Sequence, residues 1–190
     1  MKSIIEKNFI EHRKVIEKTL ENINKDLKDV GQIIVDCIGG SGCLFWCGNG
    51  GSAADSQHLA AELVGRFKKN RKPLRSVALT TDSSVLTCIA NDFSYEEIFS
   101  RQIEALARKD DVLIVISTSG VSANITKALG VCKLLGVKTI ALLGKDGGQA
   151  RSLADYSIVI PSESTARIQE AHILIGHILC DLIENELGLA

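Results

Sequence analysis

Residues 43–62 read CLFWCGNGGSAADSQHLAAE, and this stretch decides the class of fold. It starts with a short apolar run of the β type and turns through glycines at positions 48, 50 and 51. It then continues with apolar residues typical of a buried helix. A strand, a glycine turn and a helix in this order are the beginning of a βαβ unit. The stretch therefore predicts an α/β protein.

The same alternation of strand and helix continues to the C-terminal end. We expect strands at 43–47, 76–79, 112–117, 137–142 and 157–160. Helices are expected to begin near Ser52, Ser83, Tyr95, Ser122 and Gln149, with a last helix over 165–187. Each return between parallel strands needs a crossover helix, so the pattern predicts a three-layer α/β/α sandwich with a five-stranded parallel sheet.

The first 38 residues carry apolar side chains at helical spacing among alternating charges. They predict a helical arm, either continuous or broken near Gly31, in front of an α/β core at 39–190 within a single domain. The last helix is apolar nearly all round over residues 173–183. Such a helix must be covered, either in a subunit interface, which we favour, or by packing against the N-terminal arm.

Composition excludes several classes of protein. The 190 residues include 22 basic and 23 acidic ones, and a net charge of -1 provides no global field for nucleic acid or anionic lipid. Six cysteines without a CxxC pair favour small buried hydrophobes in a reducing cytosol over a disulfide framework or a zinc cage. Since neither a signal-peptide core nor a long apolar segment occurs, we expect a cytoplasmic protein.

Three turns at the carboxyl ends of the expected strands have a composition that suits a ligand. They read GNGGS, TTDSS and STSGVS, and each opens a helix. Backbone N–H groups and hydroxyls at a helix N-terminus favour a phosphate or a polyhydroxylated sugar. Taken singly, each turn also has a structural explanation, since Ser52 with Asp55 has the pattern of a capping box and Ser122 suits an N-cap. Neither a P-loop nor a GxGxxG motif occurs, so a nucleotide cofactor is not expected.

His58 and Glu62 are four residues apart and therefore share one face of the helix that GNGGS opens. This spacing suits two ligands of one divalent metal or an acid and a base, although such pairs also occur by chance on solvated helices. The last helix offers further candidates, namely Gln169, Glu170, His172 and His177. Gln169 and His177 would lie roughly 12 Å apart along the axis, so that one metal would stretch both side chains unless two subunits contributed.

Five motifs carry a resemblance to a known family. CGNGGSAADSQHLAAEL, NDFSYEEIFSRQ, ISTSGVSANI, GKDGG and TARIQEAHILIGHIL follow one another over residues 47–179. With them the chain resembles the sugar isomerase (SIS) domain family, and within it the bacterial phosphoheptose isomerases. The resemblance implies a homotetramer that converts D-sedoheptulose 7-phosphate to D-glycero-D-manno-heptose 7-phosphate. That reaction is the first step towards ADP- or GDP-heptose for lipopolysaccharide or another surface polysaccharide.

The resemblance also implies roles for individual residues. Substrate contacts fall on Asn49, Gly50, Gly51, Glu62, Asn91, Asp92, Ser117, Thr118, Ser119, Ser122 and Gln169. One zinc ion per subunit would be held by His58, Glu62, Gln169 and His177. An aldose–ketose isomerisation needs a base, an acid at the carbonyl oxygen and no redox cofactor. We assign Glu62 as the base and His177 as the acid, with the hydroxyls at 117–122 anchoring the phosphate.

Three further basic residues lie outside these assignments. Arg66 lies in the basic run RFKKNRK, which is either a solvated loop or a contact for the sugar phosphate. We expect His12 on the surface of the arm and His172 in a subunit interface.

The sequence leaves two alternatives to an isomerase of sedoheptulose 7-phosphate. Thr165 and Ala166 stand where some family members carry an acidic residue, and the form TARIQE also appears in a noncatalytic branch that binds the bacterial replication initiator. A binding module is therefore one alternative, and Glu62 together with His177 argues against it. An isomerase for another ketose phosphate is the other alternative.

Overall fold

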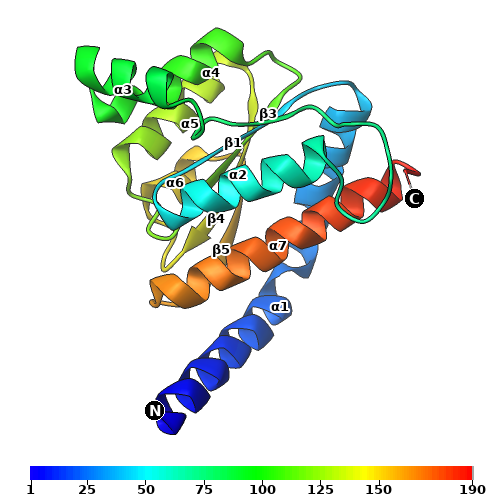
Figure 1. Cartoon of the computed structure of the whole chain (residues 1–190), viewed down its shortest axis with the longest axis vertical. Coiled ribbons are helices and arrows are strands. Elements are labelled where there is room, and N and C mark those ends of the chain that lie inside the picture. The colour runs from blue at the N-terminus through cyan, green and yellow to red at the C-terminus, as the bar shows by residue number, and fades with distance from the viewer. Residues whose placement is uncertain (190) are drawn as a thin grey trace.

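The computed structural model describes residues 1–189, except for the side chains at 24 and 25. It contains one five-stranded sheet in the order β2-β1-β3-β4-β5, in which all neighbouring strands are parallel. Figure 1 shows helices packed around this sheet. The strands are β1 (Leu44–Gly48), β2 (Ser76–Ala78), β3 (Val112–Ser117), β4 (Lys138–Gly144) and β5 (Tyr156–Ile160). The five expected strands are thus confirmed, with ends that differ by at most two residues.

Helices connect these strands in the expected order. They are α1 (Lys2–Gly39), α2 (Gly51–Val64), α3 (Ser83–Asp92), α4 (Ser100–Leu106), α5 (Ala123–Leu135), α6 (Gly148–Leu153) and α7 (Thr165–Glu186). The helix expected at Tyr95 begins as a short 3-10 turn, η1 (Tyr95–Glu97), and continues as α4.

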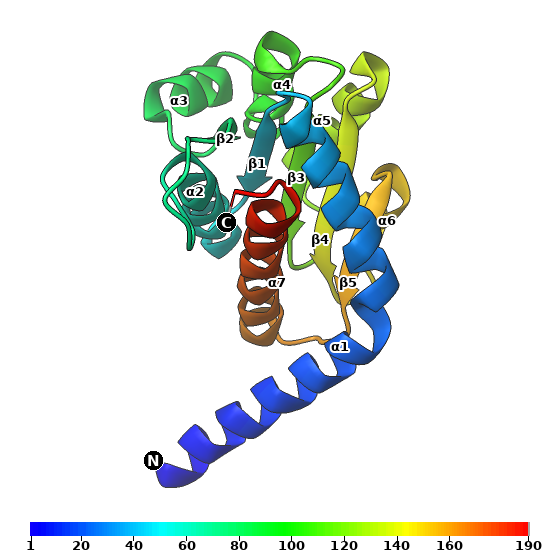
Figure 2. The ribbon, with the colours of Figure 1, turned by 90° about the vertical axis from the view of Figure 1, so that its right-hand side faces the viewer.

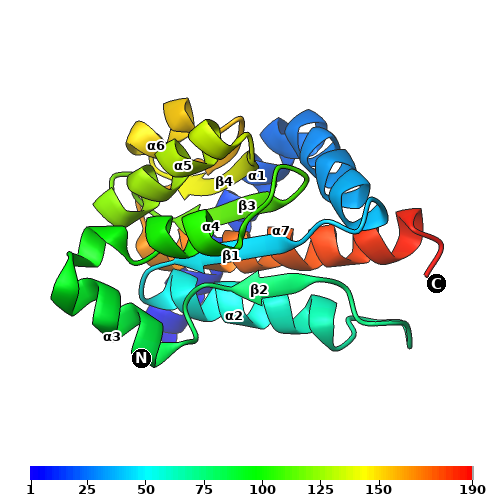
Figure 3. The same cartoon turned by 90° about the horizontal axis from the view of Figure 1, so that it is seen from above.

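The sheet is covered on both faces, because successive side chains of a strand point to opposite sides. Leu44 and Trp46 of β1 pack into a core with α1, α2 and α7, whereas Phe45 and Cys47 pack into a second core with α3, α4, α5 and α6. Figure 2 shows α1, α2 and α7 side by side in front of the sheet, and Figure 3 shows α5 and α6 on the opposite side from α2 and α7. The three-layer α/β/α architecture is confirmed.

α1 is one continuous helix, so the break near Gly31 does not occur. A glycine inside a helix costs only about 1 kcal/mol, and its neighbours Val30, Ile33 and Ile34 are buried beside α7. The N-terminal half of α1 projects beyond the core in Figure 2. That half exposes large apolar side chains, namely Ile4, Ile5, Phe9, Ile10 and Leu20.

α7 is covered within the chain by α1, α2, β4 and β5. Packing against the N-terminal helix, one of the two expected covers, therefore buries much of its apolar surface, while Leu174 stays exposed and the favoured subunit interface stays a prediction. His172 was expected at an interface, and that expectation is wrong because its side chain is fully buried inside the chain.

Five cysteines are buried and Cys88 is exposed, and all six are free thiols. Over residues 1–189, the helices are all too short or too polar to cross a membrane.

Candidate active site

The glycine turn between β1 and α2 brings the start of α2 against α7. Gly50 has φ +57°, a left-handed conformation that favours glycine, and it is the N-cap of α2. At Gly51 a Cβ would collide with the side-chain amide of Gln169 on α7. The capping box expected from Ser52 and Asp55 is wrong, because the helix starts one residue earlier and no side chain caps it. The turn therefore requires residues without a Cβ at positions 50 and 51, and it does not use a side-chain cap.

Asn49, the first residue after β1, is held by two side chains that the sequence did not single out. Its amide forms a reciprocal pair with the amide of Asn124 on α5, with both N···O distances 2.9 Å. The hydroxyl of Tyr95 donates to the same Asn49 oxygen at 3.0 Å. Asn49 is thereby oriented from two neighbouring elements at the carboxyl edge of the sheet.

Ser117 ends β3, the loop after it carries the hydroxyls of Thr118 and Ser119, and Ser122 is the N-cap residue of α5 as expected. Ser117 Oγ accepts a hydrogen bond from the backbone N–H of Gly120 at 3.0 Å. The segment that begins with GKDGG packs directly on this loop, since the backbone N–H of Ala150, two residues after the motif, donates to the carbonyl of Gly120 at 2.9 Å. A Cβ at Gly120 would collide with the backbone of Gly147, so the glycines of both motifs permit this close approach.

Asn91 and Asp92 lie in the last turn of α3 and are exposed. Asn91 Nδ2 donates to Asp92 Oδ1 at 2.8 Å, and the Cys88 thiol lies 3.5 Å from Asp92 Oδ2. The chain then continues into η1, whose Tyr95 contacts Asn49. The pair therefore lies at the end of α3, three residues before a side chain that reaches the carboxyl edge of the sheet.

The structure brings His58, Glu62 and His177 together from two helices. His58 Nε2 lies 2.9 Å from His177 Nε2 and 3.3 Å from Glu62 Oε1. The side chain of His58 is 49% exposed and that of Glu62 is 23% exposed, so solvent and a substrate can reach the cluster. The i, i+4 pair on α2 is confirmed as one face of that helix, and α7 adds the second histidine.

The donor set of this cluster fits a divalent metal. One ligand atom from each of the three residues can be chosen so that all lie within 4.8 Å of one another. Tetrahedral zinc with bonds of about 2.0–2.1 Å separates its ligand atoms by roughly 3.3 Å. The distances of 2.9 and 3.3 Å between the side-chain atoms are close to that value. Gln169 lies about two turns of α7 from His177, with its amide against Gly51.

Comparison with known proteins identifies the family of the chain that carries this site. A family model described as the SIS domain matches residues 9–144. The phosphoheptose isomerase of Helicobacter pylori (strain P12) is 51% identical over 97% of this chain and 96% of its own.

The chain belongs to the SIS domain family, and within it to the phosphoheptose isomerases.

Further comparisons agree with membership of the phosphoheptose isomerases. The phosphoheptose isomerase of a Nitratiruptor species is 53% identical over 95% of this chain and 97% of its own. The solved structure of phosphoheptose isomerase GmhA from Neisseria gonorrhoeae superposes with a TM-score of 0.92 at 38% identity, covering 97% of this chain and 98% of that one.

Two further side chains lie beside the cluster of His58, Glu62 and His177, namely Asp55 and Phe67, and the sequence did not mark either as functional. Asp55 lies one turn before His58, and its Oδ2 is buried without a hydrogen-bond partner in the described part of the chain. Burial raises the pKa of its carboxyl, and the nearby His58 opposes that shift. The ring of Phe67 stacks on the imidazole of His177, with centroids 5.5 Å apart and planes at 19°. The three-residue spacing from His58 was a usable signal for Asp55, whereas local spacing holds no signal for Phe67.

The other three basic residues considered in the sequence are Arg66, His12 and His172. Arg66 is exposed. His12 was expected on the surface of the arm; it is partly exposed, but its Nδ1 also lies 2.7 Å from Glu170 Oε2 of α7. His172 is buried with its Nε2 3.0 Å from the carbonyl oxygen of Leu143, and burial lowers its pKa to about 4.

Proposed function

We propose that the protein is an aldose–ketose isomerase that converts D-sedoheptulose 7-phosphate to D-glycero-D-manno-heptose 7-phosphate. The observation that carries this proposal is the meeting of Glu62 on α2 with His177 on α7 through His58. The relatives named phosphoheptose isomerase support the choice of substrate. A base and an acid on two separate helices can address two neighbouring carbons of one sugar.

In the proposed mechanism Glu62 and His177 exchange protons with the substrate in turn. The carboxylate of Glu62 removes a proton from C1 of the ketose while His177 donates a proton to the carbonyl oxygen at C2, which produces an enediol. Glu62 then returns its proton to C2, and His177 takes the proton from the oxygen at C1. The product is the aldose, and both residues recover their initial protonation states.

We propose one zinc ion per subunit, held by His58, Glu62, Gln169 and His177. The donors of His58, Glu62 and His177 and the distances between them support three of these ligands, and Gln169 is proposed as the fourth. When bound, the metal would share the negative charge that develops on the sugar oxygens. Because a carboxylate has two oxygens and an imidazole has two nitrogens, Glu62 and His177 can each bind the metal through one atom and exchange a proton through the other.

Substrate binding is proposed along the carboxyl edge of the sheet. The hydroxyls of Ser117, Thr118, Ser119 and Ser122 would hold the phosphate, supported by their position at the end of β3 and the N-terminus of α5. The sugar would contact Asn49, Gly50, Gly51, Glu62, Asn91, Asp92 and Gln169. Arg66 is exposed and free to reach a phosphate in its own or a neighbouring subunit.

We further propose a single domain that assembles into a homotetramer. The exposed apolar side chains on the projecting half of α1 support assembly, since a monomer would leave them in water (Figure 2). The free thiols favour a reducing compartment, and we propose the cytoplasm as the place where the product enters synthesis of ADP- or GDP-heptose for lipopolysaccharide or another surface polysaccharide.

The proposed function is tested by incubating the purified protein with sedoheptulose 7-phosphate and following the aldose product. We expect turnover by the wild type and a loss of roughly 100-fold or more in Glu62→Gln and in His177→Gln, because each removes a proton-transfer group. No product from wild type supplied with zinc, or full activity in both variants, would refute the proposal. Turnover of a different ketose phosphate alone would favour the isomerase for another sugar, and binding of the replication initiator without turnover would favour the noncatalytic module.

A further inference from the structure

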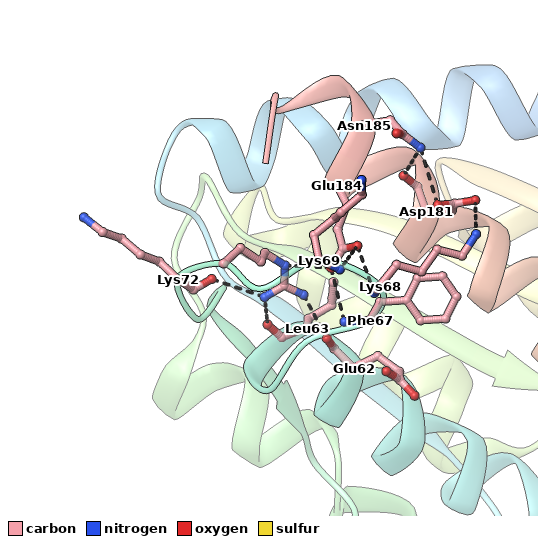
Figure 4. A network of polar contacts seen from close by, with 10 residues as sticks. Glu62, Leu63, Phe67, Lys68, Lys69, Lys72, Asp181, Glu184 and Asn185 are labelled. Atoms are coloured by element: carbon pink, nitrogen blue, oxygen red, sulfur yellow. Dashed lines mark hydrogen bonds and ion pairs between the residues drawn. The ribbon is translucent and has the colours of Figure 1, made fainter. Parts of the chain in front are cut away.

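Glu184, near the end of α7, is a buried carboxylate with four hydrogen bonds. Its side chain is 2% exposed. It accepts from the backbone N–H groups of residues 67, 68 and 69 at 3.0–3.1 Å and from Arg71 Nε at 2.9 Å (Figure 4). Burial would raise the pKa of the Glu184 carboxyl, but these donors outweigh it and keep the pKa below its usual value. The carboxylate is therefore charged and fully engaged with the 67–71 loop.

Arg71 extends the same network to the end of α2. Its Nη2 donates to the carbonyl of Glu62 at 2.9 Å, and its Nη1 donates to the carbonyl of Leu63 at 2.8 Å. These are carbonyls of the last helical turn, which have no partner within the helix itself. The guanidinium therefore connects Glu184 on α7 to the backbone of Glu62, the proposed base.

The loop that Glu184 fixes also supplies the aromatic ring beside the proposed acid. Phe67 stacks on His177 with ring centroids 5.5 Å apart. His177 lies seven residues before Glu184, two turns along the same side of α7. The hydrogen bonds that Glu184 accepts from the loop therefore hold the ring of Phe67 against His177, two turns away on the same helix.

Stability alone gives little reason for this arrangement. A buried ion pair loses much of its attraction to desolvation, and apolar residues of the same volume often stabilise a fold as well or better. What the pair provides is fixed geometry, since a planar guanidinium binds carboxylate and carbonyl oxygens in set directions. Proton transfer demands such geometry, because a misplacement of about 1 Å can cost roughly 100-fold in rate.

We propose that Glu184, Arg71 and Phe67 form a brace that sets the imidazole of His177 relative to the carboxylate of Glu62. All three are positioning residues, and the inference rests on the proposed isomerase function. Arg71 fixes the backbone of the base, Phe67 fixes the ring of the acid, and Glu184 holds both from α7. The brace requires a ring at 67 and a charged acceptor at 184.

Phe67 provides the first test, with a leucine and a tyrosine variant. Phe67→Leu keeps an apolar side chain but removes the ring, whereas Phe67→Tyr keeps the ring. We expect kcat to fall roughly tenfold or more in Phe67→Leu with little change in KM, and Phe67→Tyr to retain most of the activity. In NMR spectra with labelled histidine, the ring-current shift of the His177 protons, assigned by comparison with His177→Gln, should disappear in Phe67→Leu and persist in Phe67→Tyr.

Glu184 provides the second test, with Asp181 as the matched control. Asp181 lies one turn earlier on α7 and pairs with Lys68 of the same loop at 2.7 Å, but on the exposed surface. Glu184→Gln places a donor among backbone donors and should change the His177 ring-current shift and lower kcat, whereas Asp181→Asn should change neither. Circular dichroism and zinc content of each variant show whether fold and metal binding are retained.

The outcomes separate the brace from the isomerase function. An active wild type with unchanged kcat and unchanged His177 shifts in Phe67→Leu would overturn the brace and leave the proposed function intact. An equal loss of kcat in Phe67→Leu and Phe67→Tyr, or in Glu184→Gln and Asp181→Asn, would also overturn it. An inactive wild type would overturn the proposed function, and with it any catalytic role for the brace.

Discussion

Acidification is expected to destabilise this protein through His172. The imidazole is fully buried, and its Nε2–H donates to the carbonyl of Leu143 at 3.0 Å. Its Nδ1 is also buried and has no partner among the described residues. Protonation would therefore place a charge and a donor without an acceptor inside the core, which is why burial lowers the pKa to about 4.

The sign and the size of the effect follow from the two pKa values. In the unfolded chain His172 takes up a proton near pH 6.5, whereas in the folded chain it stays neutral down to about pH 4. Between these values the unfolded state binds more protons, so the free energy of unfolding falls as pH falls. At 1.36 kcal/mol per pKa unit, the loss between pH 7 and pH 4 is about 3 kcal/mol.

Urea unfolding of wild type and His172→Gln at several pH values measures this effect. Glutamine does not titrate, and its amide can still donate to the carbonyl of Leu143. We expect the free energy of unfolding of the wild type, relative to the variant at equal protein concentration, to fall by about 3 kcal/mol between pH 7 and pH 4. Parallel pH profiles for the two proteins would show that His172 does not stay neutral in the fold, and the argument from its burial would be refuted.

Three further changes test other parts of the site and its assembly. In Gly51→Ala the added methyl collides with the end of the Gln169 side chain, which must move, so we expect kcat to fall roughly tenfold with little loss of stability; unchanged kinetics would place Gln169 outside the reaction. In Asn124→Leu the amide of Asn49 loses one of its two partners and keeps only Tyr95, and KM should rise several-fold with kcat less affected, as steady-state kinetics will show. In Phe9→Glu a charge enters the exposed apolar side of α1, and light scattering should detect smaller assemblies; an unchanged mass would leave this side outside the interface.

Local patterns predicted the elements of this fold well, because periodicities of two and of 3.6 residues govern strands and helices within one stretch of chain. The run 112–117 was predicted to the residue as β3. The pattern failed where exact backbone geometry decides the outcome. Ser52 and Asp55 form no capping box, because Gly50 adopts a positive φ and α2 begins at Gly51, one residue earlier than expected. The continuity of α1 through Gly31 likewise depends on burial against α7 and not on local propensity.

The candidate site also combines contacts that local spacing predicts with contacts that only tertiary packing creates. His58 and Glu62 could be paired from spacing alone, because four residues of helix place them on one face whatever else the fold does. The contact between His58 and His177 could not be predicted from spacing. These residues are 119 positions apart and meet only because α2 packs on α7.

By itself the sequence determined the order of strands and helices, the glycine turn and the pairing of a histidine with a glutamate on α2. Only the tertiary structure decided that Phe67 faces His177 and that Arg71 joins Glu62 to Glu184. The physical reason is that hydrogen bonds and ring contacts between separate elements depend on distances that no local periodicity specifies.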